Sequence, residues 1–235
     1  MPAPLLAQAE PASTAPDPRP AAAPPPPLQW QYQLSQGEAR GQARLRWQPE
    51  DQRYQASLER QLEGRSLPGW RSEGGFDAGG LAPERYALQR RGRDSQATNF
   101  RRELGLISFS ASAERVPLPP GVQDRLSWML QLAALLAANP DLRQPGRQLE
   151  LPVAGLRGAA GAWRFEVRGL EALQLPVGAV PEALHLVREA QGPYDARIEV
   201  WLDPDRHYLP VRLRHSQGEQ REWELLLQAE EHPSP

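Results

Sequence analysis

The chain has 235 residues, of which 40% are hydrophobic and 24% charged, as is usual for a globular protein. The formal net charge of −2 gives no global reason to expect nucleic acid as a partner. Cysteine is absent, which excludes disulfides, thiolate nucleophiles and Cys-ligated metal sites without fixing the compartment. All 27 basic residues are arginine and are spread along the chain, which favours codon bias over phosphate recognition as the cause.

Residues 2–27 are dominated by Pro and Ala and carry almost no bulky apolar side chains. Such a segment cannot bury enough surface to offset the entropy of ordering it, and its prolines favour extended structure. We therefore predict a disordered or extended tether over residues 1–27, a single β-rich domain over residues 28–230 and a frayed tail over residues 231–235. A spacer is favoured over the alternative, a Pro-rich ligand for a recognition domain.

The chain contains no apolar run near the length of about 18 residues that a membrane span needs. The N-terminal PLLA is too short for the hydrophobic region of a secretory signal, and no basic segment precedes it. We expect any signal sequence or membrane anchor of the natural protein to lie upstream of residue 1, and to bring the domain close to a membrane.

From Leu28 onward, apolar residues recur with a period of two. In LQWQYQLSQ, Trp30, Tyr32 and Leu34 fall on one face and glutamines on the other, as in a strand with one buried face. GQARLRW and RYQASLERQL repeat this pattern, and turn-rich segments join the three. Further strands are predicted at Leu67–Phe76, Pro83–Arg91, Ala97–Leu104, Leu106–Glu114, Gln148–Leu156, Ala162–Arg168, Glu182–Glu189, Arg197–Leu202, Tyr208–Arg214 and Arg221–Gln228.

Strands joined by short turns pair antiparallel with their neighbours, and a large sheet twists and curls. The sequence therefore predicts a mainly β fold: a large curled antiparallel meander of about a dozen strands, forming a half-barrel or open barrel.

One segment, GVQDRLSWMLQLAALLAANPDL, breaks the period of two. Apolar residues at helical spacing run from Leu126 to Ala137, Asp124 is placed to cap the start, and Asn139 and Pro140 end the pattern. The opposite side of this helix is also apolar, so more of its circumference than usual should be covered. We predict that it lies across the concave face of the sheet, either as core filler or as the lid or floor of a cavity.

Asp203, Asp205 and His207 form a D-x-D-x-H pattern, which on a straight strand would suggest a metal site or an acid/base cluster. Pro204 directly after Asp203 is strong turn chemistry, and apolar alternation flanks both sides. Because the chain reverses there, we predict a hairpin whose two aspartates point into solvent, and we favour this over a metal or catalytic site. No nucleophile elbow, phosphate loop, zinc-protease or dinucleotide motif occurs, so we expect a non-enzyme without cofactor, catalytic residues or metal ligands.

The C-terminal stretch YDARIEVWLDPDRHYLPVRLR, followed by REWELLL, resembles the signature of the domain-of-unknown-function-3108 family of bacterial envelope proteins. The opening YQLSQGEARGQARLRW fits its Gly-interrupted first hairpin, and the resemblance covers about residues 28–228. That family is in turn similar in architecture to the LolA/LolB lipoprotein carriers of Gram-negative bacteria, in which a curled sheet and a crossing helix enclose an apolar cavity. The resemblance implies a periplasmic location and an apolar interior, and it supplies no catalytic residues.

Aromatic and apolar side chains of the strands and the helix form the candidate ligand site: Trp30, Tyr32, Trp47, Trp128, Met129, Leu132, Leu136, Trp163, Phe165 and Trp223. Aromatic-lined concave sites suit acyl chains and lipids, whereas the alternative is that these side chains form a closed core. We rank three functions. The first is a carrier or sensor of a lipid, acyl chain or lipoprotein, the second an envelope scaffold that binds a protein partner, and the third a hydrolase or metal enzyme, which the missing motifs disfavour.

Overall fold

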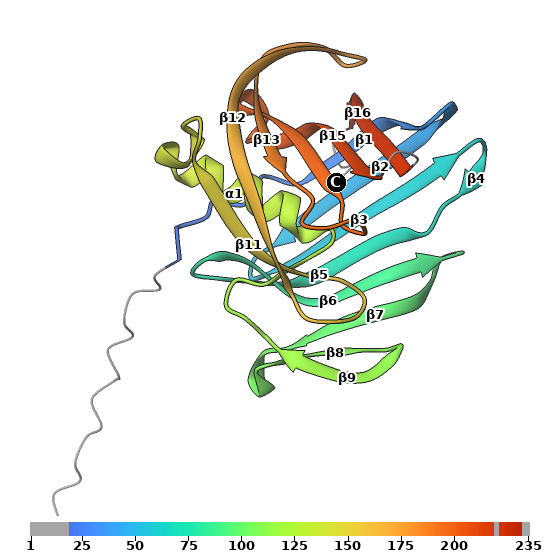
Figure 1. Cartoon of the computed structure of the whole chain (residues 1–235), viewed down its shortest axis with the longest axis vertical. Coiled ribbons are helices and arrows are strands. Elements are labelled where there is room, and N and C mark those ends of the chain that lie inside the picture. The colour runs from blue at the N-terminus through green and yellow to red at the C-terminus, as the bar shows by residue number, and fades with distance from the viewer. Residues whose placement is uncertain (1–18, 219–220, 232–235) are drawn as a thin grey trace, which may run out of the picture.

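A computed structural model describes residues 19–218 and 221–231 of the chain. Within these residues, one sheet of 16 strands curls around the helix α1 (Ser127–Ala138) without closing into a barrel (Figure 1). The prediction of a mainly β, open-barrel fold with a single helix across its concave face is confirmed. The sheet has more strands than the expected dozen, because two short pairings add strands and the segment from Leu106 divides into two.

The elements follow one another in short succession along the chain. The strands are β1 (Leu28–Gln36), β2 (Ala39–Glu50), β3 (Arg53–Leu62), β4 (Arg65–Ser66), β5 (Gly69–Asp77), β6 (Gly80–Arg90), β7 (Arg93–Arg101), β8 (Leu106–Phe109), β9 (Ser112–Pro117), β10 (Gln123–Asp124), β11 (Gln148–Ala154), β12 (Gly161–Leu175), β13 (Gly178–Arg188), β14 (Arg197–Asp203), β15 (Leu209–Gln217) and β16 (Arg221–Glu231). Short 3-10 helices occur at η1 (Arg102–Leu104), η2 (Pro140–Arg143) and η3 (Pro204–Arg206).

The order of strands across the sheet is β10-β11-β12-β13-β14-β15-β16-β1-β2-β3-β5-β6-β7-β8-β9, with β4 paired to β3. The first and last strands pair with each other in the middle, so β1–β16 contacts join the two halves of the chain. Strands β9 and β10 stand at opposite ends of this order, yet only residues 118–122 connect them. A link that short spans less than about 20 Å, so the two edges of the sheet must curl toward each other.

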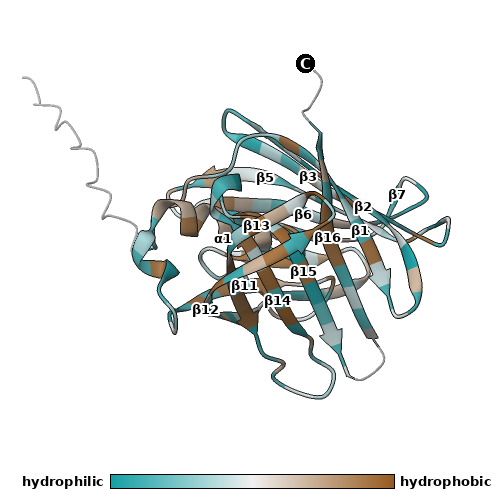
Figure 2. Ribbon diagram, turned by 90° about the horizontal axis from the view of Figure 1, so that it is seen from above, coloured by the Kyte–Doolittle hydropathy of each residue, from teal (hydrophilic) through white to brown (hydrophobic). Residues whose placement is uncertain are grey.

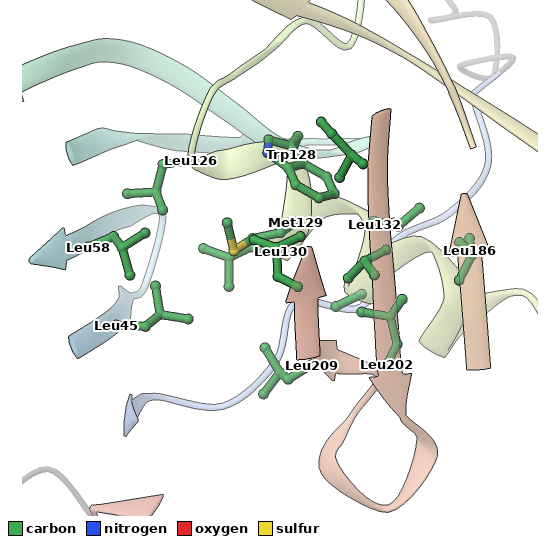
Figure 3. Close-up of a cluster of buried hydrophobic side chains, with 14 of the residues drawn as sticks. Leu45, Leu58, Leu126, Trp128, Met129, Leu130, Leu132, Leu186, Leu202 and Leu209 are labelled. Atoms are coloured by element: carbon green, nitrogen blue, oxygen red, sulfur yellow. The ribbon is translucent and has the colours of Figure 1, made fainter. Parts of the chain in front are cut away.

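The topology also explains the position of the helix. β10 pairs parallel with β11, whereas the other neighbours pair antiparallel, and a parallel pair needs a crossover connection. α1 is part of that connection and lies on the concave side, where the buried faces of both halves of the sheet meet it. Figure 3 shows Leu45 and Leu58 from one half on one side of Leu130 of the helix, with Leu202 from the other half on the opposite side and Leu209 below it.

The alternation in the sequence corresponds to this two-sided arrangement. Trp30, Tyr32 and Leu34 of β1 are buried, with 4%, 2% and 2% of their surface exposed, while the side chains between them face outward. Figure 2 shows the same alternation as hydrophobic and hydrophilic bands along β14, β15 and β16. Alternate residues of each strand therefore build a core between the sheet and α1.

The helix α1 begins at Ser127, two residues later than a cap at Asp124 predicts, and ends where the sequence predicts. The Asp124 carboxylate accepts hydrogen bonds from the backbone N–H groups of Leu126 (2.8 Å) and Ser127 (2.7 Å), and the helix ends before Asn139 and Pro140. Residues 127–136 are all buried, which confirms that the helix is covered around most of its circumference. None of the helices in the described part of the chain has the length and hydrophobicity that a membrane span requires.

The expected tether included residues 19–27, which form no helix or strand but contact the domain through their backbone. The Ala23 N–H donates to the Ala134 carbonyl of α1 (3.0 Å), and the buried Trp47 indole N–H donates to the Pro25 carbonyl (2.9 Å). The segment has few apolar side chains, but its backbone supplies a donor and an acceptor to the domain, and this holds it in place. The expectations for residues 1–18 and for the tail after Glu231 lie outside the described residues.

Candidate functional site

A cavity of about 440 Å³ opens beside the start of α1, between the two halves of the sheet. Its walls come from β5, β6 and β7 on one side and from β12, β14, β15 and β16 on the other, with the start of the helix and the loop after β11 completing it. The lining residues are Trp70, Tyr86, Gln96, Arg125, Trp128, Met129, Gly155, Leu156, Arg157, Trp163, Ile198, Leu213, His215 and Trp223.

The curl of the sheet brings the aromatic residues of this cavity together. Trp70 on β5 and Trp223 on β16 are separated by three intervening strands, which on a flat sheet would place them about 19 Å apart. Their ring centroids lie 6.3 Å apart in the folded chain. The His215 ring stacks on Trp223 at 5.1 Å and an interplanar angle of 12°, and so extends this aromatic wall.

The deep part of the cavity is apolar and closely packed. Trp128, Met129, Ile198 and Leu213 line it with 2–3% of their surface exposed. The Trp128 ring is fixed from behind by Phe165, which stacks on it at a centroid distance of 5.0 Å. Side chains packed in this way keep the walls of the cavity in place when a ligand is smaller than the cavity.

Guanidinium groups lie against the faces of the tryptophans. Arg125 lies 4.9 Å and Arg188 4.7 Å from the centroid of the Trp163 ring, and Arg60 lies 4.2 Å from the centroid of Trp70. These are cation–π contacts, which hold charge next to apolar surface. Desolvation by the surrounding side chains lowers the pKa of half-buried Arg60 and also that of Arg125, whose side chain remains partly open to solvent, but arginine remains protonated at any ordinary pH.

The charge of these arginines acts on the one histidine of the cavity. Burial lowers the pKa of His215 to about 4, and the nearby positive charges of Arg125, Arg188 and Arg60 contribute to the shift. His215 is therefore neutral at neutral pH, and its Nδ1 is buried without a hydrogen-bond partner among the described residues. No aspartate or glutamate is among the lining residues. The cavity thus has a positive electrostatic potential.

Four further polar side chains of the cavity have unused hydrogen-bonding capacity. Tyr86, Gln96, Arg125 and Arg157 make no side-chain hydrogen bond and no ion pair within residues 19–218 and 221–231. The two arginines are exposed, whereas Tyr86 is buried and Gln96 half-buried. The exposed guanidinium groups therefore mark the open end of the cavity.

The structure places four of the predicted ligand-binding residues in this cavity: Trp128, Met129, Trp163 and Trp223. The other six do not line it: Trp30, Tyr32, Trp47, Leu132, Leu136 and Phe165. Leu132, Leu136 and Phe165 have no exposed surface and fill the core around α1. The alternative of a closed core therefore applies to these three residues.

The three aromatic residues from β1 and β2 have other structural roles. The Tyr32 hydroxyl donates to the Pro210 carbonyl (2.8 Å), and the Trp47 indole binds Pro25 as described above. Trp30 borders a separate hollow of about 340 Å³ beside the turn at η3. Each of these aromatic residues is buried on the concave side, but at a distance along the strand from the cavity.

Sequence reasoning missed Trp70, Tyr86, Arg125, Arg157 and His215 as cavity residues. Trp70 and Tyr86 occupy predicted strands, so the signal that could have found them was the same aromatic alternation that selected Trp223. For the arginines and His215 the sequence carries no comparable signal, because their approach to the cavity depends on how far the sheet curls.

The D-x-D-x-H segment forms the predicted hairpin, with β14 and β15 joined through η3. The prediction that Asp203 points into solvent is wrong. It is 3% exposed, its carboxylate accepts from the Asp205 N–H (3.0 Å), and it also pairs with Arg206. Asp205 and His207 are exposed as expected for a turn. The described residues contain no group of three or more His, Asp or Glu side chains arranged to hold a metal ion.

The fold and the cavity together define a class of protein: an open β-barrel with a helix across its concave face and an aromatic, positively charged cavity beside that helix. The sequence profile of the family described as "Protein of unknown function (DUF3108)" matches residues 31–218. The chain belongs to this family. No curated protein matches its sequence.

Solved structures support the fold. The chain is similar to a beta-barrel-like protein of the DUF1849 family from Brucella abortus, with a TM-score of 0.60, 13% identity, and coverage of 91% of this chain and 100% of that one. MucB gives a TM-score of 0.35 at 10% identity, covering 88% of this chain and 54% of MucB. A Bacteroides fragilis protein with a YmcC-like fold gives 0.39 at 10% identity, covering 91% and 100%. The likeness to the Brucella protein shows a shared fold, and the other two scores are too low to carry an argument.

Proposed function

We propose that this protein is a non-enzymatic periplasmic envelope protein that binds the hydrocarbon chain of a lipid, a fatty acid or a lipoprotein in the cavity beside α1. The observation that carries the proposal is the cavity itself: about 440 Å³ of space with buried walls of Trp128, Met129, Ile198 and Leu213. This volume falls in the range of about 300–1,000 Å³ typical of small-molecule sites. Hydrocarbon transferred from water to such walls is stabilised by about 25 cal/mol per Å².

The residues of the cavity favour binding over catalysis. Its lining contains no serine, threonine, lysine or carboxylate side chain that could act as a nucleophile or as the partner of a histidine. The one histidine, His215, has a lowered pKa and an apolar stacking partner. A hydrolase would need a nucleophile within hydrogen-bond reach of a base.

The proposed location is supported by the composition of the chain and by its resemblance to periplasmic proteins. A chain without cysteine is compatible with the oxidising periplasm, and the resemblance to lipoprotein carriers points to the same compartment. A lipid released from a membrane into such an aqueous space must have its hydrocarbon chain shielded from water by a protein, because the chain is insoluble. A cavity that opens on one side would provide this shielding.

A scaffold function is the second candidate, favoured by the sheet edge at β9. Residues 112–115 of this strand are exposed, and its outer side is free of a neighbouring strand in the described chain. An exposed edge can add a strand from a partner protein through backbone hydrogen bonds. An acyl-binding cavity and a protein-binding edge are compatible in one molecule.

The proposal is tested by titrating the full chain with a fluorescent fatty-acid probe. We expect about one probe per chain and quenching of tryptophan emission, since three tryptophans besides Trp128 line the cavity. Met129→Trp and Leu156→Trp fill the cavity from two different elements and should each weaken binding at least about tenfold. Leu104→Trp, at a residue that is 70% exposed and outside the cavity lining, is the matched control.

The folding of each variant is checked by circular dichroism before the titration. Loss of binding in both cavity variants, with binding retained in Leu104→Trp, supports the proposal. If the wild-type chain binds no probe, or if the cavity variants bind as well as the control, the acyl-binding function is wrong.

A further inference from the structure

We infer that the cavity selects amphiphiles with one hydrocarbon chain and an anionic head group, and that Arg125 and Arg157 bind the head group. This inference rests on the proposed function and adds to it the chemical class of the ligand. A carboxylate and a phosphate monoester share the relevant chemistry, which is a negative charge spread over oxygen acceptors.

The exposure of the lining residues gives the orientation of the ligand. Trp128, Met129 and Leu213 are buried in the deep part, whereas Arg125 and Arg157 are exposed. A bound chain would lie against the apolar deep walls. Its polar end would then lie at the open side, within reach of the two guanidinium groups.

The guanidinium group of Arg125 is held in a position that suits the binding of an anion. Its guanidinium lies on the Trp163 ring, and on another side it approaches Gly155, where an added Cβ would come within 3.4 Å of Nε and 3.5 Å of Nη2. These contacts restrict the side chain without using its hydrogen-bond donors. A guanidinium that is already ordered loses less entropy when it binds a carboxylate or phosphate.

The comparison with Arg188 shows why Arg125 is available. Both guanidinium groups lie against the Trp163 ring, at 4.9 Å for Arg125 and 4.7 Å for Arg188. Arg188 is buried and its guanidinium already forms an ion pair with Asp195 at 2.6 Å. Arg125 has no carboxylate partner within the described residues. One of the two cations on this ring is therefore left for an external anion.

Neighbouring side chains strengthen the attraction between the cavity and an anionic head group. Arg60, whose guanidinium lies 4.2 Å from the Trp70 ring and 6.0 Å from the Trp223 ring, adds a further positive charge, and its Nε is buried without a hydrogen-bond partner in the described chain. The Tyr86 hydroxyl and the Gln96 amide can donate hydrogen bonds to an oxygen-rich head group. A cationic head group would be repelled, because the lining contains positive charges and no carboxylate to balance them.

The inference is tested by calorimetric titration of the full chain with three ligands of equal chain length: dodecanoate, dodecyl phosphate and dodecanol. We expect both anions to bind at least about tenfold more tightly than the alcohol, because a charge-assisted hydrogen bond replaces a neutral one. The double variant Arg125→Gln/Arg157→Gln should lose this preference and bind dodecanol as the wild type does. Dodecanoate and dodecyl phosphate distinguish a fatty-acid head group from a phosphate one.

Arg115→Gln is the matched control, since Arg115 is an exposed arginine on β9 outside the cavity. It should keep the preference for anions. Arg125→Lys keeps the charge without the planar contact on Trp163 and should give an intermediate affinity. Equal binding of all three ligands to the wild type, or an anion preference that survives the double variant, overturns the inference while the acyl-binding proposal stands. If none of the three ligands binds, the acyl-binding proposal itself fails.

Discussion

The Asp124 carboxylate and the Ser72 hydroxyl meet in the interior at 2.5 Å, where they join the start of α1 to strand β5. Both side chains have no exposed surface. Burial raises the pKa of Asp124 to about 6, although hydrogen bonds from Ser72, Ser127 and Leu126 favour the ionised form. The link between helix and sheet therefore contains a carboxylate whose ionisation is opposed by its surroundings.

This carboxylate makes stability dependent on pH. The pKa in the folded state is about 6, above the value of 3.8 for a free aspartate, so the folded chain binds more protons than the unfolded chain between these values. The free energy of unfolding should fall as pH rises from about 4 to about 6, by up to about 3 kcal/mol from this group. Asp124→Asn should remove that slope, because an amide does not titrate in this range. The amide oxygen can still accept hydrogen bonds from the helix N–H groups, so the start of α1 should be kept.

The measurement is urea unfolding of wild type and Asp124→Asn at a series of pH values from 4 to 8. The difference between the two curves isolates Asp124 from the other titrating groups. Asp141→Asn, an exposed carboxylate just after the same helix, is the control for loss of charge alone. A constant difference between wild type and Asp124→Asn across the range would contradict the assignment.

At the η3 turn, Asp203 and Asp205 should respond differently to the same substitution. Asp203 is buried, caps the turn through the Asp205 N–H and pairs with Arg206, so Asp203→Ala should lower the free energy of unfolding by about 1–3 kcal/mol. The Asp205 side chain is exposed, and Asp205→Ala should change stability by less than about 0.5 kcal/mol. Chemical denaturation measures the free energy of unfolding of both variants. Equal effects of the two substitutions would show that the Asp203 cap does not contribute to stability.

The sequence predicts local structure here better than it predicts the site. Alternation selected the strands and the buried aromatic faces because each strand has one wet side, and the Asp124 cap and Asn139-Pro140 stop defined the helix. Trp30 and Trp223 carry the same pattern, yet only Trp223 lines the cavity. Which of them does so depends on the position along the strand relative to α1, and periodicity does not contain that information.

The cationic part of the site was beyond sequence reasoning for a related reason. Arg125 and Arg157 stand outside any alternating segment, and they converge with Trp70 and Trp223 only because the sheet curls. Curvature arises from twist summed over many strands, and small differences per strand decide where the two halves meet. The arginines of this chain are also so widely spread that no single one is marked by composition.

The segment of residues 19–27 should contribute to stability through its backbone. Its removal takes the Pro25 carbonyl from the Trp47 indole N–H and the Ala23 N–H from the Ala134 carbonyl of α1. Trp47 has no exposed surface in the intact chain, so its donor would lose a buried partner. We expect a chain that starts at residue 28 to be less stable than one that starts at residue 19 by about 2–4 kcal/mol.

A double-mutant cycle separates this hydrogen bond from the other contacts of the segment. Trp47→Phe removes the indole N–H while it keeps an aromatic ring in the core, so the truncation should be less damaging in the Trp47→Phe background than in the wild type. The coupling energy expected for one buried hydrogen bond is about 1 kcal/mol. Urea unfolding of the four proteins measures it, and strictly additive effects would mean that the Trp47–Pro25 bond does not hold the segment to the domain.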